Sequence, residues 1–318
     1  MAIRLFIPLK TVHFTFFLLF VAGSVLAQKY PPIYLFSYFK GNGEDGLHLA
    51  YSTDGYQYQA LKRDSSFLKP TVGQDKLMRD PCIIRGHDGR FHMVWTVSWK
   101  EKSIGYASSA DLIHWTEQQN LPVMAHEEGA RNCWAPEITY DYRSGQYMIY
   151  WATTLMGKFP ETQDAAENAY NHRIYYTTTT DFNSYSPTKL LYEPGFNVID
   201  ATIQRNGDQF VMFLKDETRT PPQKNLRLAF SNSLTGPYSK AGSPITGKYW
   251  AEGPTVAKLI DLWIVYFDKY TEHTYGAVTS TDLKTWTDVS DKVSFPKGTR
   301  HGTVLTITKE ELARLQKH

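Results

Sequence analysis

Acidic residues stand at the start of four apolar stretches of this 318-residue chain. They are Asp80 in Arg79-Asp80-Pro81, Glu137 in Trp134-Ala135-Pro136-Glu137, Asp200 in Val198-Ile199-Asp200-Ala201 and Glu252 in Ala251-Glu252-Gly253-Pro254. A fifth stretch has His301 at this point, in Arg300-His301-Gly302. Carboxyl groups crowded into one site repel one another, which separates their pKa values and lets one act as an acid and another as a base. The sequence therefore predicts an acid/base site, provided that the fold brings these five points together.

A short pattern recurs five times, at a spacing of roughly 50 residues. In each copy an apolar strand leads into a turn rich in Ser and Thr, and an aromatic residue follows the turn. The copies are Ser52-Thr53-Asp54 to Tyr58, Ser109-Ala110-Asp111 to Trp115, Thr179-Thr180-Asp181 to Tyr185, Asn232-Ser233-Leu234 to Tyr238, and Ser280-Thr281-Asp282 to Trp286. Such a repeat is typical of a β-propeller, because each blade is a meander that cannot bury its faces alone. Five copies predict an all-β, five-bladed β-propeller, whose inner strands start around one axis.

One blade is expected to be shared between the two ends of the chain. Apolar hairpins precede four of the repeats, at Cys82 to Thr96, Glu137 to Thr153, Ala201 to Leu214 and Thr255 to Phe267. The first repeat has only the strand Ile33 to Phe39 ahead of it, and a spare strand, Thr303 to Thr308, lies near the C-terminus. Pairing of these two strands would close the ring and leave no open edge. The alternative is an open β-sandwich with accidental repeats.

The first 27 residues have the features of a secretory signal peptide. Arg4 and Lys10 precede an apolar run, Phe14 to Ala22, and Val25-Leu26-Ala27 forms a small-residue cleavage site before Gln28. The run is too short to span a bilayer, and no cysteine follows it for lipid attachment. We expect a secreted or periplasmic protein without a membrane anchor, in which residues 28–318 form a single propeller domain.

Charge and cysteine content limit the possible partners. The formal net charge of +2 falls to 0 without Arg4 and Lys10, and no basic stripe remains, which argues against nucleic acid and favours a neutral substrate. The two cysteines, Cys82 and Cys133, are too few for a structural zinc site. They either pair across neighbouring blades or remain buried thiols.

The ordered motifs resemble those of glycoside hydrolase family 43, the five-bladed propeller glycosidases that include α-L-arabinofuranosidases, β-xylosidases and arabinanases. The resemblance extends from about Ile33 to Thr308 and rests on Asp80-Pro81, Trp134-Ala135-Pro136-Glu137, Ile199-Asp200, Glu252-Gly253-Pro254 and His301-Gly302. It implies an inverting hydrolase with three carboxylates. Asp80 matches the general base, Asp200 the residue that tunes and orients the acid, and Glu252 the general acid. A second carboxylate near Glu252 is expected to raise the pKa of that residue.

The resemblance also bears on Glu137 and His301. Glu137 is expected to support the fold through hydrogen bonds rather than to react. His301 matches a position that helps to hold a calcium ion, mostly through waters, or that contacts the sugar. No cofactor is expected to be required, and a structural calcium near the channel centre is possible.

Loops between the second and third strands of each blade are expected to form the rim of the site. They carry Trp99, Phe159, Lys215-Asp216-Glu217 and Asp268-Lys269, and Trp134 adds a further aromatic face. Aromatic faces stack on sugars, and charged groups bind hydroxyls. The longest rim loop, Leu155 to His172, would close one end of the pocket and favour action on a terminal sugar.

We therefore predict an exported, monomeric glycoside hydrolase that removes terminal sugars, α-L-arabinofuranosyl units first among them, from plant-type oligo- or polysaccharides. Alternatives within the fold are a β-xylosidase, an exo-galactosidase and an endo-acting arabinanase or xylanase. A carbohydrate-binding propeller without turnover is the alternative from another class. Asp45, in Gly43-Glu44-Asp45-Gly46, is the competing candidate for the base.

Overall fold

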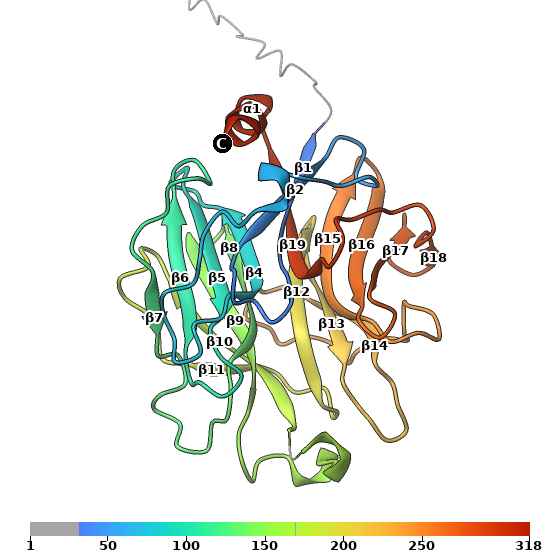
Figure 1. The fold of residues 1–318 in the computed structure, drawn as a ribbon. Coiled ribbons are helices and arrows are strands. Elements are labelled where there is room, and N and C mark those ends of the chain that lie inside the picture. The colour runs from blue at the N-terminus through green and yellow to red at the C-terminus, as the bar shows by residue number, and fades with distance from the viewer. Residues whose placement is uncertain (1–31, 169) are drawn as a thin grey trace, which may run out of the picture. The chain divides into compact units, whose positions relative to one another are not determined.

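The computed structural model describes residues 32–168 and 170–318, so the predicted signal peptide lies outside the described residues. The described strands form five antiparallel sheets arranged as the blades of a propeller (Figure 1). The predicted all-β, five-bladed β-propeller is confirmed.

Each blade is one meander of neighbouring strands. Blade 1 contains β4 (Arg79–Arg85), β5 (Phe91–Thr96), β6 (Ile104–Ser109) and β7 (Gln119–Leu121). Blade 2 contains β8 (Trp134–Asp141), β9 (Gln146–Thr154), β10 (His172–Thr179) and β11 (Lys189–Tyr192). Blade 3 contains β12 (Val198–Asn206), β13 (Gln209–Asp216) and β14 (Asn225–Ser231). Blade 4 contains β15 (Glu252–Leu259), β16 (Leu262–Lys269), β17 (Thr274–Ser280) and β18 (Thr287–Asp288). Blade 5 contains β19 (Arg300–Ile307), β1 (Ile33–Phe39), β2 (His48–Ser52) and β3 (Gln59–Ala60).

The inner strands close a ring around the axis. Contacts run from β19 to β4, β8, β12, β15 and back to β19. Blade 5 closes the ring because β19 pairs antiparallel with β1, from Ile33 opposite Ile307 to Phe39 opposite Arg300. The expected pairing of the chain ends is therefore present, and the open β-sandwich is wrong.

The repeated sequence pattern is a turn stabilised by its own side chains. In the copy after β6, the hydroxyl of Ser109 accepts from the backbone N–H of Leu112 at 2.9 Å, and Asp111 Oδ1 accepts from the N–H of Ile113 and His114 at 2.9 and 2.8 Å. The copies with Asp54, Asp181 and Asp282 repeat this arrangement. These side-chain bonds compete with regular structure and so end the third strand at the same place in four blades.

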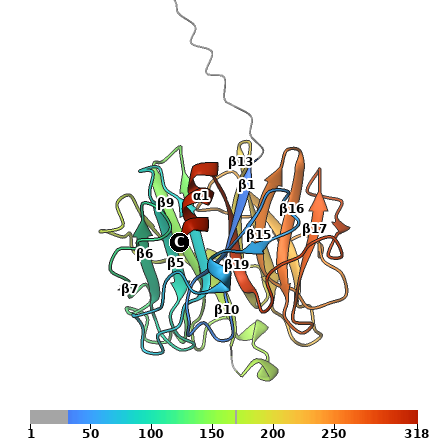
Figure 2. The same ribbon diagram turned by 45° about the horizontal axis from the view of Figure 1, so that its top comes forward.

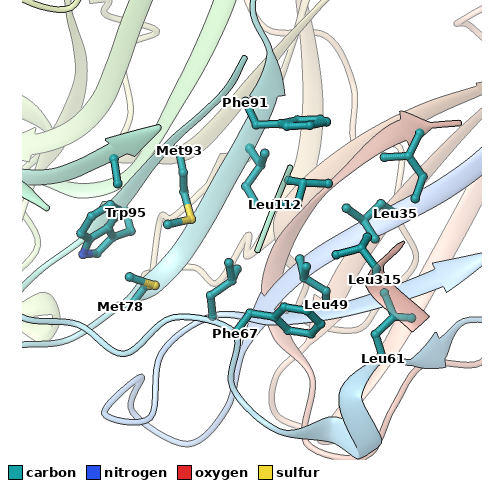
Figure 3. Close-up of a cluster of buried hydrophobic side chains, with 14 of the residues drawn as sticks. Leu35, Leu49, Leu61, Phe67, Met78, Phe91, Met93, Trp95, Leu112 and Leu315 are labelled. Atoms are coloured by element: carbon teal, nitrogen blue, oxygen red, sulfur yellow. The ribbon is translucent and has the colours of Figure 1, made fainter. Parts of the chain in front are cut away.

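The core is divided among the contacts between neighbouring blades. Figure 3 shows one such cluster, in which Leu35 and Leu49 of blade 5 lie near Phe91 and Met93 of blade 1. Leu315 of the C-terminal helix α1 (Lys309–Lys317) is buried in the same cluster. In both ribbon views α1 lies at the opposite end of the propeller from the long loop after β9 (Figures 1 and 2). That loop contains the 3₁₀ turns η2 (Pro160–Thr162) and η3 (Ala165–Glu167), and a third, η1 (Lys62–Asp64), follows β3.

Cys82 and Cys133 are both buried and unpaired. Burial raises the pKa of each thiol. Within residues 32–168 and 170–318, no helix has the length and apolar character needed to cross a membrane.

The start of every inner strand has the same irregularity. The pairing register shifts between Arg79 and Cys82, between Trp134 and Glu137, between Ile199 and Thr202 and between Glu252 and Thr255. In blade 5 the register shifts between Ser37 and Phe39 of β1, which lie opposite Thr303 and Arg300 of β19. Asp80, Ala135, Asp200 and Gly253 have positive φ angles of 52°, 45°, 52° and 59°. These are β-bulges, which leave one residue unpaired and turn its side chain in a new direction.

Aligning the five bulges sorts the channel residues into layers. The rim layer is Arg79, Trp134, Ile199, Glu252 and Arg300, the bulge layer is Asp80, Ala135, Asp200, Gly253 and His301, and the deep layer is Cys82, Glu137, Thr202, Thr255 and Thr303. The expectation that all four acids occupy one equivalent position is therefore wrong. Glu137 lies two residues deeper than Asp80 and Asp200, and Glu252 lies one residue nearer the rim.

Glu137 joins three blades in the deep layer. Its carboxyl group accepts from the hydroxyl of Thr202 in blade 3 at 2.9 Å and from that of Thr303 in blade 5 at 3.4 Å. Burial raises the pKa of Glu137 to about 7, although the Thr202 hydrogen bond and the charge of His301 lower it. The geometry fits the expected supporting role.

We predict that Glu137→Gln makes the fold less sensitive to rising pH. The pKa of Glu137 in the folded state is above the value of 4.5 for an unperturbed Glu, so its stabilising contribution is complete below pH 4.5 and is lost as the pH rises through 7. Between pH 5 and 8 the free energy of unfolding should fall by about 2–3 kcal/mol more in the wild type than in Glu137→Gln, measured by urea denaturation. The exposed Glu310→Gln should behave as the wild type. Identical pH dependence in all three proteins would contradict the prediction.

Candidate active site

A pocket of ≈ 300 Å³ opens at the end of the channel where the inner strands begin. The whole rim layer and Asp80, Ala135, Asp200 and His301 of the bulge layer line it. All the predicted site residues line this pocket except Phe159 and Asp268: Asp80, Asp200, Glu252, Trp99, Trp134, Lys215 and His301. Glu137 lines a separate pocket of ≈ 500 Å³ on the other side of the bulge layer.

Phe159 does not reach the pocket, because the Arg173 guanidinium covers its ring at 4.2 Å from the centroid. Its loop instead lines a neighbouring pocket of ≈ 430 Å³ with Glu161 to Ala165. Among the described residues, the loop therefore adds nothing to the wall of the main pocket, which removes the reason for expecting it to close that pocket. Arg219 lines both pockets.

Asp80 is held by two partners. Its Oδ2 accepts from the Thr96 hydroxyl at 2.7 Å, and its Oδ1 lies 3.4 Å from Nδ1 of His301. Thr96 faces Arg79 in the β4–β5 ladder, and its hydroxyl accepts from the N–H of Ala135 at 2.8 Å. Asp45, the competing candidate for the base, lies between β1 and β2, is about half exposed, and pairs with His48 Nε2 at 2.8 Å. Only Asp80 of these two lines the pocket.

Asp200 and His301 lie together beneath Glu252. Asp200 Oδ2 accepts from the N–H of Gly253 at 3.0 Å and lies 4.0 Å from His301 Nδ1. Gly253 is required here, because a Cβ at this position would lie 2.4 Å from the His301 ring. Burial raises the pKa of Asp200 to about 6, against the charges of His301 and Lys215. Burial alone would lower the pKa of His301, but the carboxylates of Asp200 and Asp80 outweigh it and raise that pKa.

Glu252 is paired with two cations. Its Oε2 lies 3.1 Å from Lys215 Nζ, and its Oε1 lies 3.2 Å from the Arg300 guanidinium. Burial would raise the pKa of Glu252, but Lys215 and Arg300 outweigh it, so the pKa is lowered. The expected raised pKa of Glu252 is therefore wrong for this structure. The raised pKa belongs to Asp200, which lacks comparably close cations.

Asp268 does not line the pocket but contacts Arg300, which does. It faces Glu252 in the β15–β16 ladder, is 1% exposed, and accepts from Arg300 Nε at 2.7 Å. Burial raises the pKa of Asp268 to about 6, and the charge of Glu252 adds to the rise. Asp268 thus orients Arg300 toward Glu252.

Trp99 and Trp134 form an aromatic corner. Their rings meet edge to face at 5.6 Å, and the Trp134 indole N–H donates to the Trp99 carbonyl at 3.1 Å. Trp99 is 41% exposed, as a ring that stacks on a bound sugar must be.

Several lining residues were not predicted from the sequence: Arg79, Arg300, Lys224, Arg219, Trp250 and Tyr270. Arg79 and Arg300 directly precede Asp80 and His301, so aligning the motifs on Pro81, Pro136, Pro254 and Gly302 would have identified the rim layer. Glu217, expected on the rim with Lys215, does line the pocket, and its carboxylate lies 2.6 Å from both Lys215 Nζ and Lys224 Nζ.

The surroundings of His301 do not fit a calcium ion coordinated directly by its ring, and a calcium held through waters, as the resemblance implies, stays a prediction. Nδ1 faces two carboxylates, and its raised pKa favours the imidazolium form, which cannot act as a ligand. Calcium prefers six to eight oxygen ligands. Within the described ranges no group of three or more His, Cys, Asp or Glu side chains could hold a metal ion.

Comparison with known proteins places the chain among glycosidase-related propellers. An α-L-arabinofuranosidase of Bifidobacterium longum subsp. longum is 23% identical over an alignment that covers 57% of this chain and 20% of that protein. The crystal structure of the α-L-arabinofuranosidase from Lactobacillus brevis has a TM-score of 0.53 and 17% identity, with 73% of this chain and 90% of that chain covered. The exo-β-1,3-galactanase from Phanerochaete chrysosporium has a TM-score of 0.53 and 11% identity, with 70% and 52% covered.

The chain spans only about a fifth of the curated relative that it matches, and the structural likenesses establish the fold. The family assignment rests on a model related to glycoside hydrolase family 43 and described as a probable glycosyl hydrolase domain. It matches residues 31–313, nearly the whole propeller. The chain therefore belongs to this glycoside hydrolase family 43-related family.

Proposed function

We propose that this protein is an inverting glycoside hydrolase with Asp80 as the general base, Glu252 as the general acid and Asp200 as the residue that controls the acid. The observation that supports it is that all three carboxylates line one pocket, with His301 next to Asp80 and Asp200. Water-mediated inversion requires a base and an acid on opposite sides of the sugar, about 6.5–9.5 Å apart. Asp80 in blade 1 and Glu252 in blade 4 come from non-adjacent blades, as this arrangement requires.

The base is oriented before substrate arrives. The Thr96 hydroxyl and the His301 ring fix the two oxygens of Asp80, so that a remaining lone pair can accept a proton from water. As that water attacks the anomeric carbon, Asp80 takes its proton, and the glycosidic bond breaks as Glu252 gives its proton to the departing oxygen.

The acid must gain its proton when substrate binds. Lys215 and Arg300 favour the ionised form of Glu252. A sugar that excludes water and draws Lys215 or Arg300 toward its hydroxyls would weaken these pairs and raise the pKa of Glu252. Asp200, whose pKa is raised to about 6, is the neighbouring group that can hold the proton beforehand.

We propose a terminal α-L-arabinofuranosyl unit of a plant-type polysaccharide as the substrate. The names of the two arabinofuranosidases similar to this chain favour this sugar, and the galactanase makes galactose the second sugar to test. The mechanism requires no cofactor.

We predict that Asp80→Asn and Glu252→Gln each lower kcat/KM by about 10²–10⁴-fold, because each removes one proton-transfer group. Nitrophenyl α-L-arabinofuranoside, β-D-xyloside and β-D-galactoside should be assayed with the purified wild type and variants. Asp45→Asn, the matched control, should retain wild-type activity. Activity lost in Asp45→Asn and retained in Asp80→Asn would transfer the base role to Asp45.

We also predict that Lys215→Met moves the alkaline limb of the kcat/KM profile to higher pH. Loss of the ammonium raises the pKa of Glu252, so the protonated acid persists to higher pH. Lys269→Met removes a charge that pairs with Glu272 outside the pocket and should leave the limb in place. If the alkaline limb of Lys215→Met stays at the wild-type pH, a group other than Glu252 determines its position.

A further inference from the structure

The pocket contains more permanent cations than anions, although the chain after residue 27 has no net charge. Arg79, Lys215, Arg219, Lys224 and Arg300 line it, against the acids Asp80, Asp200, Glu217 and Glu252. Three of the cations have close protein partners. Lys215 pairs with Glu217 and Glu252, Lys224 with Glu217, and Arg300 with Glu252 and Asp268.

Arg79 differs from these three. It is 8% exposed, yet within residues 32–168 and 170–318 no carboxylate lies within 4 Å of its guanidinium. Among the described residues, its one side-chain acceptor is the amide oxygen of Asn42, at 3.0 Å from Nη1. A guanidinium has five N–H donors, so most N–H groups of Arg79 have no side-chain acceptor among the described residues. Burying a charge without a close counter-ion is costly. The more distant carboxylates of Asp80, Glu252 and Asp200 offset this cost only in part, since burial still lowers the pKa of Arg79. An anion from outside the chain would supply the close partner.

The surroundings hold the Arg79 guanidinium in one orientation. It lies 4.2 Å from the centroid of the Trp99 ring and 4.6 Å from that of Phe39. The amide of Asn42 also accepts from the Trp99 indole N–H at 3.0 Å, so Asn42 fixes the arginine and the ring together. A planar guanidinium held in this way matches the two oxygens of a carboxylate.

We propose that the glycan bound in this pocket carries a carboxylate, as hexuronic acids do, and that Arg79 binds it. The inference rests on the proposed function and specifies its substrate class. Arg79 directly precedes Asp80, so we expect the acidic sugar in the position next to the terminal arabinofuranosyl unit that is cleaved. The net charge of the chain predicted a neutral substrate. The charges that line the pocket favour an acidic glycan instead, because cations outnumber anions there.

Calorimetric titration with D-glucuronic acid, D-galacturonic acid and their uncharged methyl esters tests this inference. The wild type should bind at least one acid about tenfold more tightly than its ester, as expected for one charge-assisted bidentate contact. Arg79→Gln should abolish this preference. Arg79→Lys keeps the charge but cannot bind both carboxylate oxygens at once, so it should retain only part of the preference. Arg131→Gln is the matched control, since Arg131 also stacks on an aromatic ring, that of Tyr170 at 4.2 Å, but does not line the pocket.

Equal affinity of the wild type for acid and ester, or binding of neither acid at millimolar concentration, overturns the inference whether or not the variants fold. A preference that persists in Arg79→Gln with a wild-type thermal midpoint also overturns it. Hydrolysis assays separate the two proposals. If the protein hydrolyses neutral glycosides and shows no preference for the acids over their esters, only this inference is wrong. If it prefers the acids through Arg79 but hydrolyses no glycoside, only the hydrolase proposal is wrong.

Discussion

The β-bulge at the start of each inner strand is the constraint on which the pocket depends. It leaves one residue per blade unpaired and gives it a positive φ in four of the five blades. Without the bulge, side chains would alternate between the two faces of each blade and would not converge on the axis. The bulge brings Asp80, Asp200 and His301 to one level, with Glu252 and Arg300 directly above, so that groups far apart in the sequence share one environment.

In that environment the neighbouring cations, rather than burial, determine the order of the carboxyl pKa values. Burial acts to raise the pKa of both Glu252 and Asp200, but Lys215 and Arg300 contact Glu252, whereas the close partners of Asp200 among the described residues are His301 at 4.0 Å and the N–H of Gly253. The pocket therefore favours an ionised Glu252 and a proton on Asp200 below pH 6. Substrate must redistribute this charge before Glu252 can donate a proton, which links binding to catalysis.

The sequence predicted the fold well because its signals are local. Turn chemistry such as that of Ser109 and Asp111 is encoded within a few residues, and the missing strand before the first repeat identified the pairing of β1 with β19. It also identified Asp80, Asp200 and Glu252 in the pocket, since each belongs to a short motif. The bulge register was harder to predict, because one inserted residue moves a side chain to another layer, and Glu137 was placed too near the rim for this reason. The pKa order depends on pairs between residues distant in the sequence, such as Glu252 with Lys215 and Arg300, which no local motif encodes.

The most direct test of the account is the anomeric configuration of the sugar that is first released. Hydrolysis of a nitrophenyl glycoside or polysaccharide substrate can be followed by proton NMR in the first minutes, before mutarotation equilibrates the anomers. We expect the product to appear first with the configuration opposite to that of the substrate, because Asp80 directs water to the face opposite the leaving group. First release of the retained anomer would require a covalent intermediate and would contradict the roles assigned to Asp80 and Glu252.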